Sequence, residues 1–443
     1  MNVQEMKAAV CAAIDKNAEK IIALGESIFN EPELGYKEFK TAAKIQAALD
    51  EIGLEHQDGV AVTGILTPFK GRDHKAHLAL MGELDAVLVK DHPNADPVTG
   101  AAHACGHFAQ AAALVGVAYA LKETGVMEHL DGDITLMHVP AEEFVELEWR
   151  KKDLIDTQGA VKLLGGKQEF IRLGVFDNVD MMVMQHSRAT EDEDRPQEIK
   201  ADAGGTGMGF VGRMIQYTGK ASHAAAPHMG VNALKAAQLG LAGIDANRET
   251  FRDQDTIRVH PIITKGGNLV NVVPADVRIE TYVRGKTMPG VLDASVKVNR
   301  AFEAGAMAVG AQVEIVEVPG YMPRRNDENF NKIFEENLNI LVGPEHVQHL
   351  GHMGGCSDFG DVQHLVPAIH PYIGGMTGGG HASDFAVQDP EMAYITAAKS
   401  MAMTAIDLLA NGCEKLLELK KDFVPVYKNR EEYLAAWAQL MGE

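Results

Sequence analysis

The amino-acid sequence predicts an α/β fold in which a layered catalytic domain is interrupted by a smaller α+β domain. Three observations predict it. The chain of 443 residues is too long for one compact domain. Short apolar stretches alternate with helical patterns in the first half, which is typical of an α/β sandwich. The pattern then changes at about Gly204, where a second arrangement of strands and helices begins.

The first part of the chain supplies the alternating elements. Apolar residues at helical spacing predict a helix before the breaker run at 30–32 and a second one over 37–52. Strands are expected at 76–81, 134–139 and 181–185, with a helix over 109–121 between the first two. Because ligands gather at the carboxyl edge of open sheets, the polar residues that come after these strands are the candidates for chemistry.

The second part, residues 204–319, has a βαββαβ order. We expect strands near 208–218, 257–264, 277–284 and 313–318, and helices over 232–244 and 292–309. Such an order is typical of an inserted domain. The predicted boundaries are therefore 1–203 and 320–443 for a discontinuous first domain and 204–319 for the insert, with a long helix over 391–411 packing back on the first sheet.

Composition limits the partners and the compartment. The formal charge of −21 disfavours nucleic acid and anionic membrane surfaces. Neither an apolar run long enough to span a membrane nor a signal-peptide core is present, which predicts a cytoplasmic protein. The four scattered cysteines do not form a disulfide scaffold, so we expect them to be reduced.

The segment His103-Ala104-Cys105-Gly106-His107 has the densest set of metal-binding side chains. Thiolate and imidazole are ligands that suit zinc-like ions. Side chains two residues apart diverge on a helix, so Cys105 and His107 converge only if this segment is a loop that enters a helix near Phe108. The alternative is a polar helix cap with a buried structural cysteine.

Glu142 and Glu143 come directly after the strand predicted at 134–139. Adjacent carboxylates point in different directions, which suits one as a metal ligand and the other as the carrier of a proton. A solvated acidic turn is the simpler interpretation.

Three more candidates come from other strand ends and from a glycine-rich loop. His186 comes after the strand at 181–185, and His381 comes after the glycine-rich run at 374–380. With Cys105, His107 and Glu143 they supply enough ligands for two metal ions. Asp85 comes after the strand at 76–81 and is expected to orient a ligating imidazole, although it could instead cap the next helix.

The insert offers polar groups for a substrate carboxylate or a developing oxyanion. His223 lies between a predicted strand and a predicted helix, while Asn271 and Arg284 flank strands. Turn residues and surface charges are the alternative.

These motifs, taken in order, resemble the aminoacylase-like metallopeptidases, in particular the amidohydrolase branch with hippurate, indoleacetyl-amino-acid and p-aminobenzoyl-glutamate hydrolases. The likeness includes the runs 31–35, 85–86, 103–107 and 140–143 and His186, then 219–227, 266–267 and 271–274 in the insert, then 357–359 and His381. It implies a phosphorylase/hydrolase-like sandwich as the catalytic domain, and an inserted lid through which two copies dimerise.

The resemblance also implies roles. Cys105 bridges two divalent ions, and His107, Glu143, His186 and His381 complete their shells. Glu142 is the general base. His223 and Asn271 contact the substrate from the lid.

The sequence departs from the family pattern in three places that affect the substrate more than the activity. Phe108 stands where the family usually has an acid, and the run 144–150 replaces a glycine-rich stretch. The family's run of acid-Met-Asp-Ala-Leu-Pro appears as Glu83-Leu84-Asp85-Ala86-Val87-Leu88.

We therefore expect a metal-dependent amidohydrolase that acts on a small N-acyl amino acid, an aminobenzoyl-glutamate-like compound or a dipeptide. Its mixed ligand set accepts Zn or Mn, and also Co or Ni. Two alternatives remain: a cysteine hydrolase that uses Cys105 with His107, and a non-catalytic metal-binding protein of the same fold.

Overall fold

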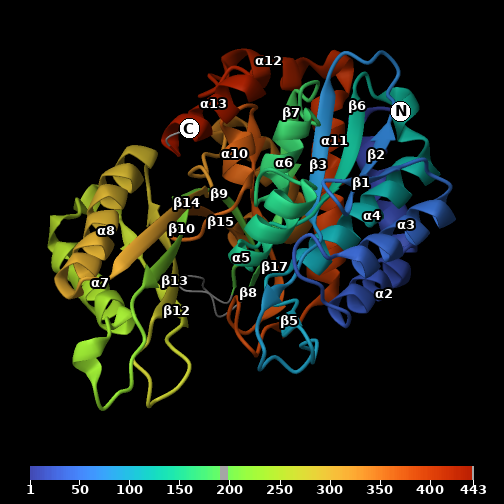
Figure 1. The fold of residues 1–443 in the computed structure, drawn as a ribbon. Helices are drawn as coiled ribbons and strands as arrows, with labels where there is room; N and C mark the ends of the chain where they lie inside the picture. Colours follow the sequence, from blue (N-terminus) through green and yellow to red (C-terminus); the bar gives the residue numbers. More distant parts are fainter. Residues whose placement is uncertain (190–197, 442–443) are drawn as a thin grey trace. The chain divides into compact units, whose positions relative to one another are not determined.

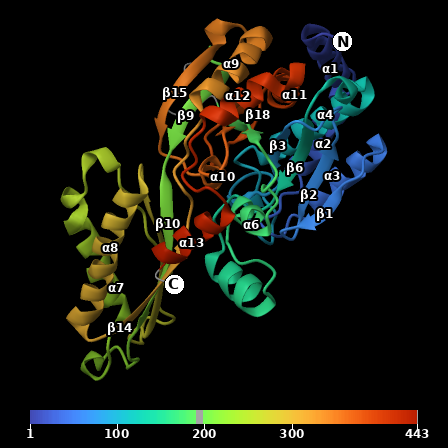
Figure 2. The ribbon, with the colours of Figure 1, turned by 90° about the horizontal axis from the view of Figure 1, so that it is seen from above.

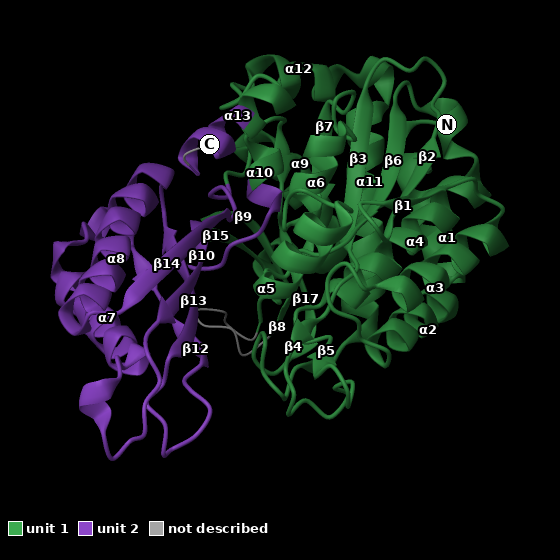
Figure 3. Cartoon of the chain, in the orientation of Figure 1, with its two compact units in different colours: residues 1–206, 325–353, 361–434 green, residues 207–324, 354–360, 435–443 purple. Residues whose placement is uncertain are grey.

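A computed structural model describes residues 1–189 and 198–441 (Figure 1). The chain divides into two compact units, which are described separately (Figure 3). Unit 1 comprises 1–206, 325–353 and 361–434, and unit 2 comprises 207–324, 354–360 and 435–443. Among the described residues, no helix combines the length and the apolar character needed to cross a membrane.

Unit 1 is built on a mixed six-stranded sheet. The strand order is β1-β2-β6-β3-β7-β16, in which β6, β3, β7 and β16 run parallel and β1 and β2 run antiparallel to their neighbours. The strands are β1 (Gln57–Val60), β2 (Gly64–Phe69), β3 (His77–Glu83), β6 (Asp133–Val139), β7 (Met181–Met184) and β16 (Ala368–Ile369). The strands predicted near 76–81, 134–139 and 181–185 are thus neighbours in one sheet, and β3 and β6 are buried along almost their whole length.

A second sheet of unit 1 joins distant parts of the chain. It has the order β15-β9-β17-β18, with β8 also paired to β17. Its strands are β8 (His186–Ala189), β9 (Ala201–Gly207), β15 (Val347–Met353), β17 (Tyr372–Thr377) and β18 (Ala386–Val387). A small two-stranded sheet, β4 (Val87–Leu88) and β5 (Ala101–Ala102), precedes the HxCxH segment.

Helices α3, α4, α9 and α11 contact the main sheet. The helices of unit 1 are α1 (Val3–Lys16), α2 (Ala18–Phe29), α3 (Phe39–Ile52), α4 (His107–Thr124), α5 (Leu147–Trp149), α6 (Gly166–Leu173), α9 (Glu328–Val342), α11 (Ala397–Leu409) and α12 (Glu414–Asp422) (Figure 2). Helix α10 (Phe359–Gln363) belongs to unit 1 from Asp361 on, whereas helix α13 (Arg430–Leu440) begins in unit 1, and its residues from Ala435 on belong to unit 2. The helix predicted over 391–411 begins as a π-helix, Glu391–Thr396, before α11.

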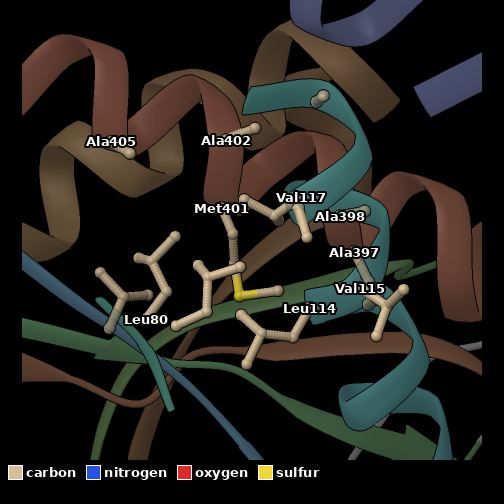
Figure 4. Packing of buried hydrophobic residues seen from close by; sticks show 14 of the residues in the cluster. Leu80, Leu114, Val115, Val117, Ala397, Ala398, Met401, Ala402 and Ala405 are labelled. Carbon is tan, nitrogen blue, oxygen red and sulfur yellow. The ribbon is translucent and has the colours of Figure 1, made fainter. Parts of the chain in front are cut away.

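The core of unit 1 lies between β3, α4 and α11. Leu80 of β3 packs with Leu114 of α4 and Met401 of α11, and small residues such as Ala398 let the two helices approach closely (Figure 4). Almost all of α4 is buried, so this helix is apolar on all sides instead of amphipathic. The packing fixes α4, and its first residue is His107.

Unit 2 has the βαββαβ order expected for the insert. Its sheet has the order β11-β13-β10-β14, with β12 also paired to β13. The elements are β10 (Gly209–Thr218), α7 (Ala233–Asn247), β11 (Arg258–Val259), β12 (Ile262–Lys265), β13 (Asp276–Gly285), α8 (Met288–Val309) and β14 (Gln312–Pro319). The strand expected over 257–264 is therefore two short strands separated by Pro261, which cannot donate a backbone hydrogen bond.

Helices α7 and α8 pack against each other and against one face of the unit 2 sheet. Along β13, buried and half-buried residues alternate strictly, as expected for a strand with one covered face. The half-buried set, which includes Tyr282 and Arg284, lies on the face away from the helices.

Candidate metal centre

The site in unit 1 begins where strand β5 leads into helix α4. Gly106 has a φ of +95°, and a β-carbon at this position would lie 2.4 Å from Cβ of Ser187. Glycine therefore permits the turn that precedes α4 and its close approach to β8. The segment is the loop-to-helix transition that convergence of Cys105 and His107 requires.

Around Cys105, the structure brings together all five predicted ligands. Cys105, His107 and His186 each offer one ligand atom, and these atoms lie within 4.8 Å of one another. Cys105, Glu143 and His381 form a second set under the same criterion. The sulfur of Cys105 belongs to both sets, as a bridging ligand would.

Of two contacts between ligand atoms, one has the length expected within a coordination shell and the other is slightly shorter. Sγ of Cys105 lies 3.4 Å from Nε2 of His186, and Oε1 of Glu143 lies 3.1 Å from Nε2 of His381. Two ligands on one tetrahedral ion, with bonds of about 2.0–2.3 Å, are roughly 3.3–3.6 Å apart. In addition, Nε2 of His107 is buried and makes no hydrogen bond within the described part of the chain, with Oε2 of Glu83 3.2 Å away.

Asp85 orients two parts of the site. Nδ1 of His107 lies 2.9 Å from the backbone oxygen and 3.1 Å from Oδ1 of Asp85, an arrangement that leaves Nε2 directed at the site. The backbone N–H of Glu143 donates to Oδ2 of the same carboxylate over 2.8 Å.

The turn that carries Glu142 is held from two sides. Ala141 has a φ of +55°, an unfavourable conformation for a residue with a β-carbon. Its N–H donates to the buried carboxylate of Glu38 over 2.8 Å, while the N–H of Glu143 binds Asp85. Glu142 lies between these anchors, almost buried, with Oε2 4.0 Å from Nε2 of His107.

The electrostatics of the cluster are those of a cation site. Burial alone would raise the pKa of the Cys105 thiol, but the positive charges of His107, His186 and His381 lower it to about 6. Burial likewise opposes ionisation of Glu143, yet His381 lowers its pKa to about 2. Glu143 in turn raises the pKa of His381 to about 12. Protonated imidazoles here balance the thiolate and carboxylate charges, as divalent ions would after displacing the protons.

The sequence did not indicate a role for Glu83 at this site. Its fully buried carboxylate lies 3.2 Å from Nε2 of His107, 2.5 Å from Nζ of Lys167 and 2.9 Å from Nε2 of Gln110. Burial raises the pKa of Glu83, but the nearby Lys167 and His107 outweigh it and hold that pKa far below its usual range. Its place two residues before Asp85, at the same strand end, was the available signal.

The sequence also did not indicate that Glu38 contributes to this site. This residue precedes α3, yet its side chain does not cap that helix, and it accepts instead from Thr63 over 2.7 Å and from Ala141. Burial and the neighbouring Asp85 raise the pKa of Glu38 to about 7.

Phe108 is buried against Phe29, His103 and Tyr394, so the position where the resemblance expects an acid belongs to the core. Residues 144–150, a second segment that differs from the family pattern, are held in place by contacts with the loop before α3. Lys37 binds Glu146 over 2.7 Å and lies 3.8 Å from the ring centroid of Trp149.

The predicted substrate-binding residues His223, Asn271 and Arg284 belong to unit 2. The first two are exposed and linked through the backbone, since the N–H of Ala224 donates to the oxygen of Asn271 over 2.9 Å. The guanidinium of Arg284 lies 5.3 Å from the ring centroid of Tyr282. Their roles stay predictions.

Several known proteins are similar to this chain. The chain is 29% identical to the human Xaa-Arg dipeptidase over 96% of its own length and 92% of that protein. It is 25% identical to the IAA-amino acid hydrolase ILR1-like 4 of Arabidopsis thaliana, over 80% and 77% of the two chains. The YXEP protein of Bacillus subtilis, described as a dinuclear metal binding peptidase, superposes with a TM-score of 0.64 at 23% identity, over 89% and 99% of the two chains. The model of the peptidase family M20/M25/M40 matches residues 79–407, and the chain belongs to this family.

Proposed function

We propose that the protein is a metal-dependent amidohydrolase that cleaves the amide bond of a small N-acyl amino acid, an aminobenzoyl-glutamate-like compound or a dipeptide. The observation that carries the proposal is the pair of ligand sets that share Cys105, with Glu142 beside them. Relatives that are named for dipeptide and indoleacetyl-amino-acid hydrolysis support the substrate range.

Each residue has a role in this proposal. Cys105, His107, Glu143, His186 and His381 hold two divalent ions, for which Zn or Mn suits the mixed ligand set best and Co or Ni is acceptable. The bound ions would polarise the scissile carbonyl and favour ionisation of the attacking water. Asp85 fixes His107. Glu142 takes a proton from the water and delivers it to the leaving amine.

The insert predicted over residues 204–319, most of which lies in unit 2, is proposed to be the substrate-binding lid and the surface through which two copies dimerise. His223, Asn271 and Arg284 would bind the substrate, with Arg284 suited to its carboxylate. Light scattering coupled to size-exclusion chromatography tests the dimer, and a monomer at micromolar concentration would contradict it.

The test is hydrolysis by metal-loaded protein of a panel of N-acyl amino acids and dipeptides, paired with Glu142→Gln. This variant should retain two ions per chain by elemental analysis while the chemical step slows by several orders of magnitude, about 10²–10⁴-fold for the lost proton transfer alone. A fully loaded protein that cleaves no member of the panel would favour the non-catalytic binding protein.

One observation favours a second candidate, a cysteine hydrolase. The thiol of Cys105, with a lowered pKa, lies 3.4 Å from an imidazole, that of His186. Chelation separates the two candidates, because EDTA abolishes a metal-dependent activity and leaves a thiolate nucleophile intact.

A further inference from the structure

We propose that a hollow on the sheet of unit 2 binds the two carboxylates of an acidic amino-acid moiety. The hollow has a volume of about 370 Å³ and lies on the face away from α7 and α8. Its lining includes Arg258, His260, Tyr282 and Arg284. Arg284 is already a candidate for one substrate carboxylate. This proposal adds a role for Arg258 and for the hollow as a binding site.

The two arginines face each other across neighbouring strands. Arg258 of β11 is the direct partner of Arg284 of β13 in the antiparallel pairing. Side chains of directly opposed residues lie on the same face, with β-carbons about 5 Å apart. Like charges in this arrangement repel each other, so it weakens the sheet unless an anion lies between them.

Neither arginine is neutralised within the described part of the chain. No ion pair or hydrogen bond of either guanidinium to a carboxylate occurs among residues 1–189 and 198–441, whereas Arg213 and Arg278 of the same sheet pair with Glu317 and Asp276. Among the described residues that line the hollow, Glu280 is the one acid. The chain carries 62 acidic against 41 basic residues, so the two arginines in this hollow contrast with the acidic composition of the chain as a whole.

The chemistry of the pair selects the ligand. A guanidinium binds a carboxylate through two parallel hydrogen bonds, and two guanidinium groups provide for two carboxylates. The α- and side-chain carboxylates of glutamate or aspartate are separated by a few bonds, which matches the spacing of a cross-strand pair. A single α-carboxylate would occupy one arginine only.

This inference rests on the proposed function in one respect: the acidic moiety is taken to be the amino acid released from the amide. Substrates would then be N-acyl-glutamate or N-acyl-aspartate compounds, with Arg284 on one carboxylate and Arg258 on the other. A leaving residue with a cationic side chain would be disfavoured by the same charges.

Direct binding tests the hollow without catalysis. Calorimetric titration of metal-loaded, full-length Glu142→Gln protein with L-glutamate and L-glutamine should show tighter binding of glutamate by about tenfold or more, as expected for a charged hydrogen-bonded pair. Adding Arg258→Met should remove this preference. Adding Arg278→Met is the matched control, because Arg278 lies on β13, the strand of Arg284, but pairs with Asp276, and the preference should persist.

Kinetics on the otherwise unaltered protein give the second readout. The Arg258→Met variant should lower kcat/KM for N-acetyl-L-glutamate about 10–100-fold and that for N-acetyl-L-glutamine less than about threefold. Equal losses on both substrates, no loss, or a preference for dipeptides ending in arginine would overturn the inference. If the unaltered protein cleaves no member of the panel of N-acyl amino acids and dipeptides, the proposed function fails, and the titration still decides whether the hollow binds a dicarboxylate.

Discussion

Asp85 shows how one side chain can set the geometry of a candidate metal centre. One of its oxygens faces Nδ1 of His107 and the other accepts from the N–H of Glu143, so it fixes one candidate ligand on α4 and another after β6. In Asp85→Asn one oxygen becomes an NH₂ group, which would face one of these donors. We expect metal affinity to fall about 10–100-fold, measured by competition with a chromophoric chelator.

Asp180→Asn is the control for this prediction, since Asp180 pairs with the surface residue Lys420. Unchanged affinity in Asp85→Asn would show that the backbone contact to His107 is sufficient.

His138 of β6 makes a separate prediction, about stability. Burial lowers the pKa of this histidine to about 4. Because the unfolded chain binds the proton at pH values below about 6.5 and the folded chain does not, the contribution of neutral His138 is present above 6.5 and lost as the pH falls towards 4. The loss amounts to about 1.4 kcal/mol per pH unit within this window.

The measurement is urea unfolding of the metal-free protein in EDTA at several pH values between 7 and 4.5. His138→Gln should have a shallower dependence of the unfolding free energy on pH than the unaltered protein, by about one proton. Parallel curves for the two proteins would mean that His138 is protonated in the fold.

At the scale of elements, the loop before α3 holds the turn after β6 in place through a hydrogen bond. The side chain of Glu38 does not cap α3. It accepts hydrogen bonds from the hydroxyl of Thr63 and the N–H of Ala141 instead. In Glu38→Ala neither contact can form, which loosens the left-handed Ala141. We expect kcat to fall about tenfold to a hundredfold, with KM and metal content unchanged, because misplacement of Glu142 affects the chemical step.

Glu33→Ala is the matched control. Glu33 lies in the same loop and accepts from the backbone N–H groups of Lys40 and Thr41 at the start of α3. Its loss should lower the stability of the helix and leave kcat unchanged. If Ala141→Gly, which relieves the strained φ, restores no activity to Glu38→Ala, the turn is not the element through which Glu38 acts.

At the scale of the molecule, the sequence predicts best the contacts that result from the order of the strands. Asp85, Glu143 and His186 lie just after strands β3, β6 and β7, which are neighbours in one sheet, and this proximity is a consequence of the α/β pattern. The α/β pattern does not predict the contact of Glu83 with Lys167 or that of Glu38 with Ala141. These contacts join residues that are separated by 84 and 103 positions in the sequence, through packing of loops and helices. No local pattern indicates that Gly354–Gly360 belongs to unit 2.

Metal removal provides a prediction for the whole chain. Buried Glu83, Glu142 and Glu143 lie with the Cys105 thiol in one cluster, and divalent ions would offset their charges in the folded state only. At a metal concentration a hundredfold above Kd, one ion should add about 2.7 kcal/mol to the unfolding free energy and raise Tm by a few degrees. Calorimetry in Zn or Mn and in EDTA measures this shift.

The variant His381→Ala should reduce this shift in Tm. The control His346→Ala, which changes a histidine outside the cluster, should leave the shift unchanged. A shift that survives in His381→Ala would mean that the stabilising ions bind elsewhere.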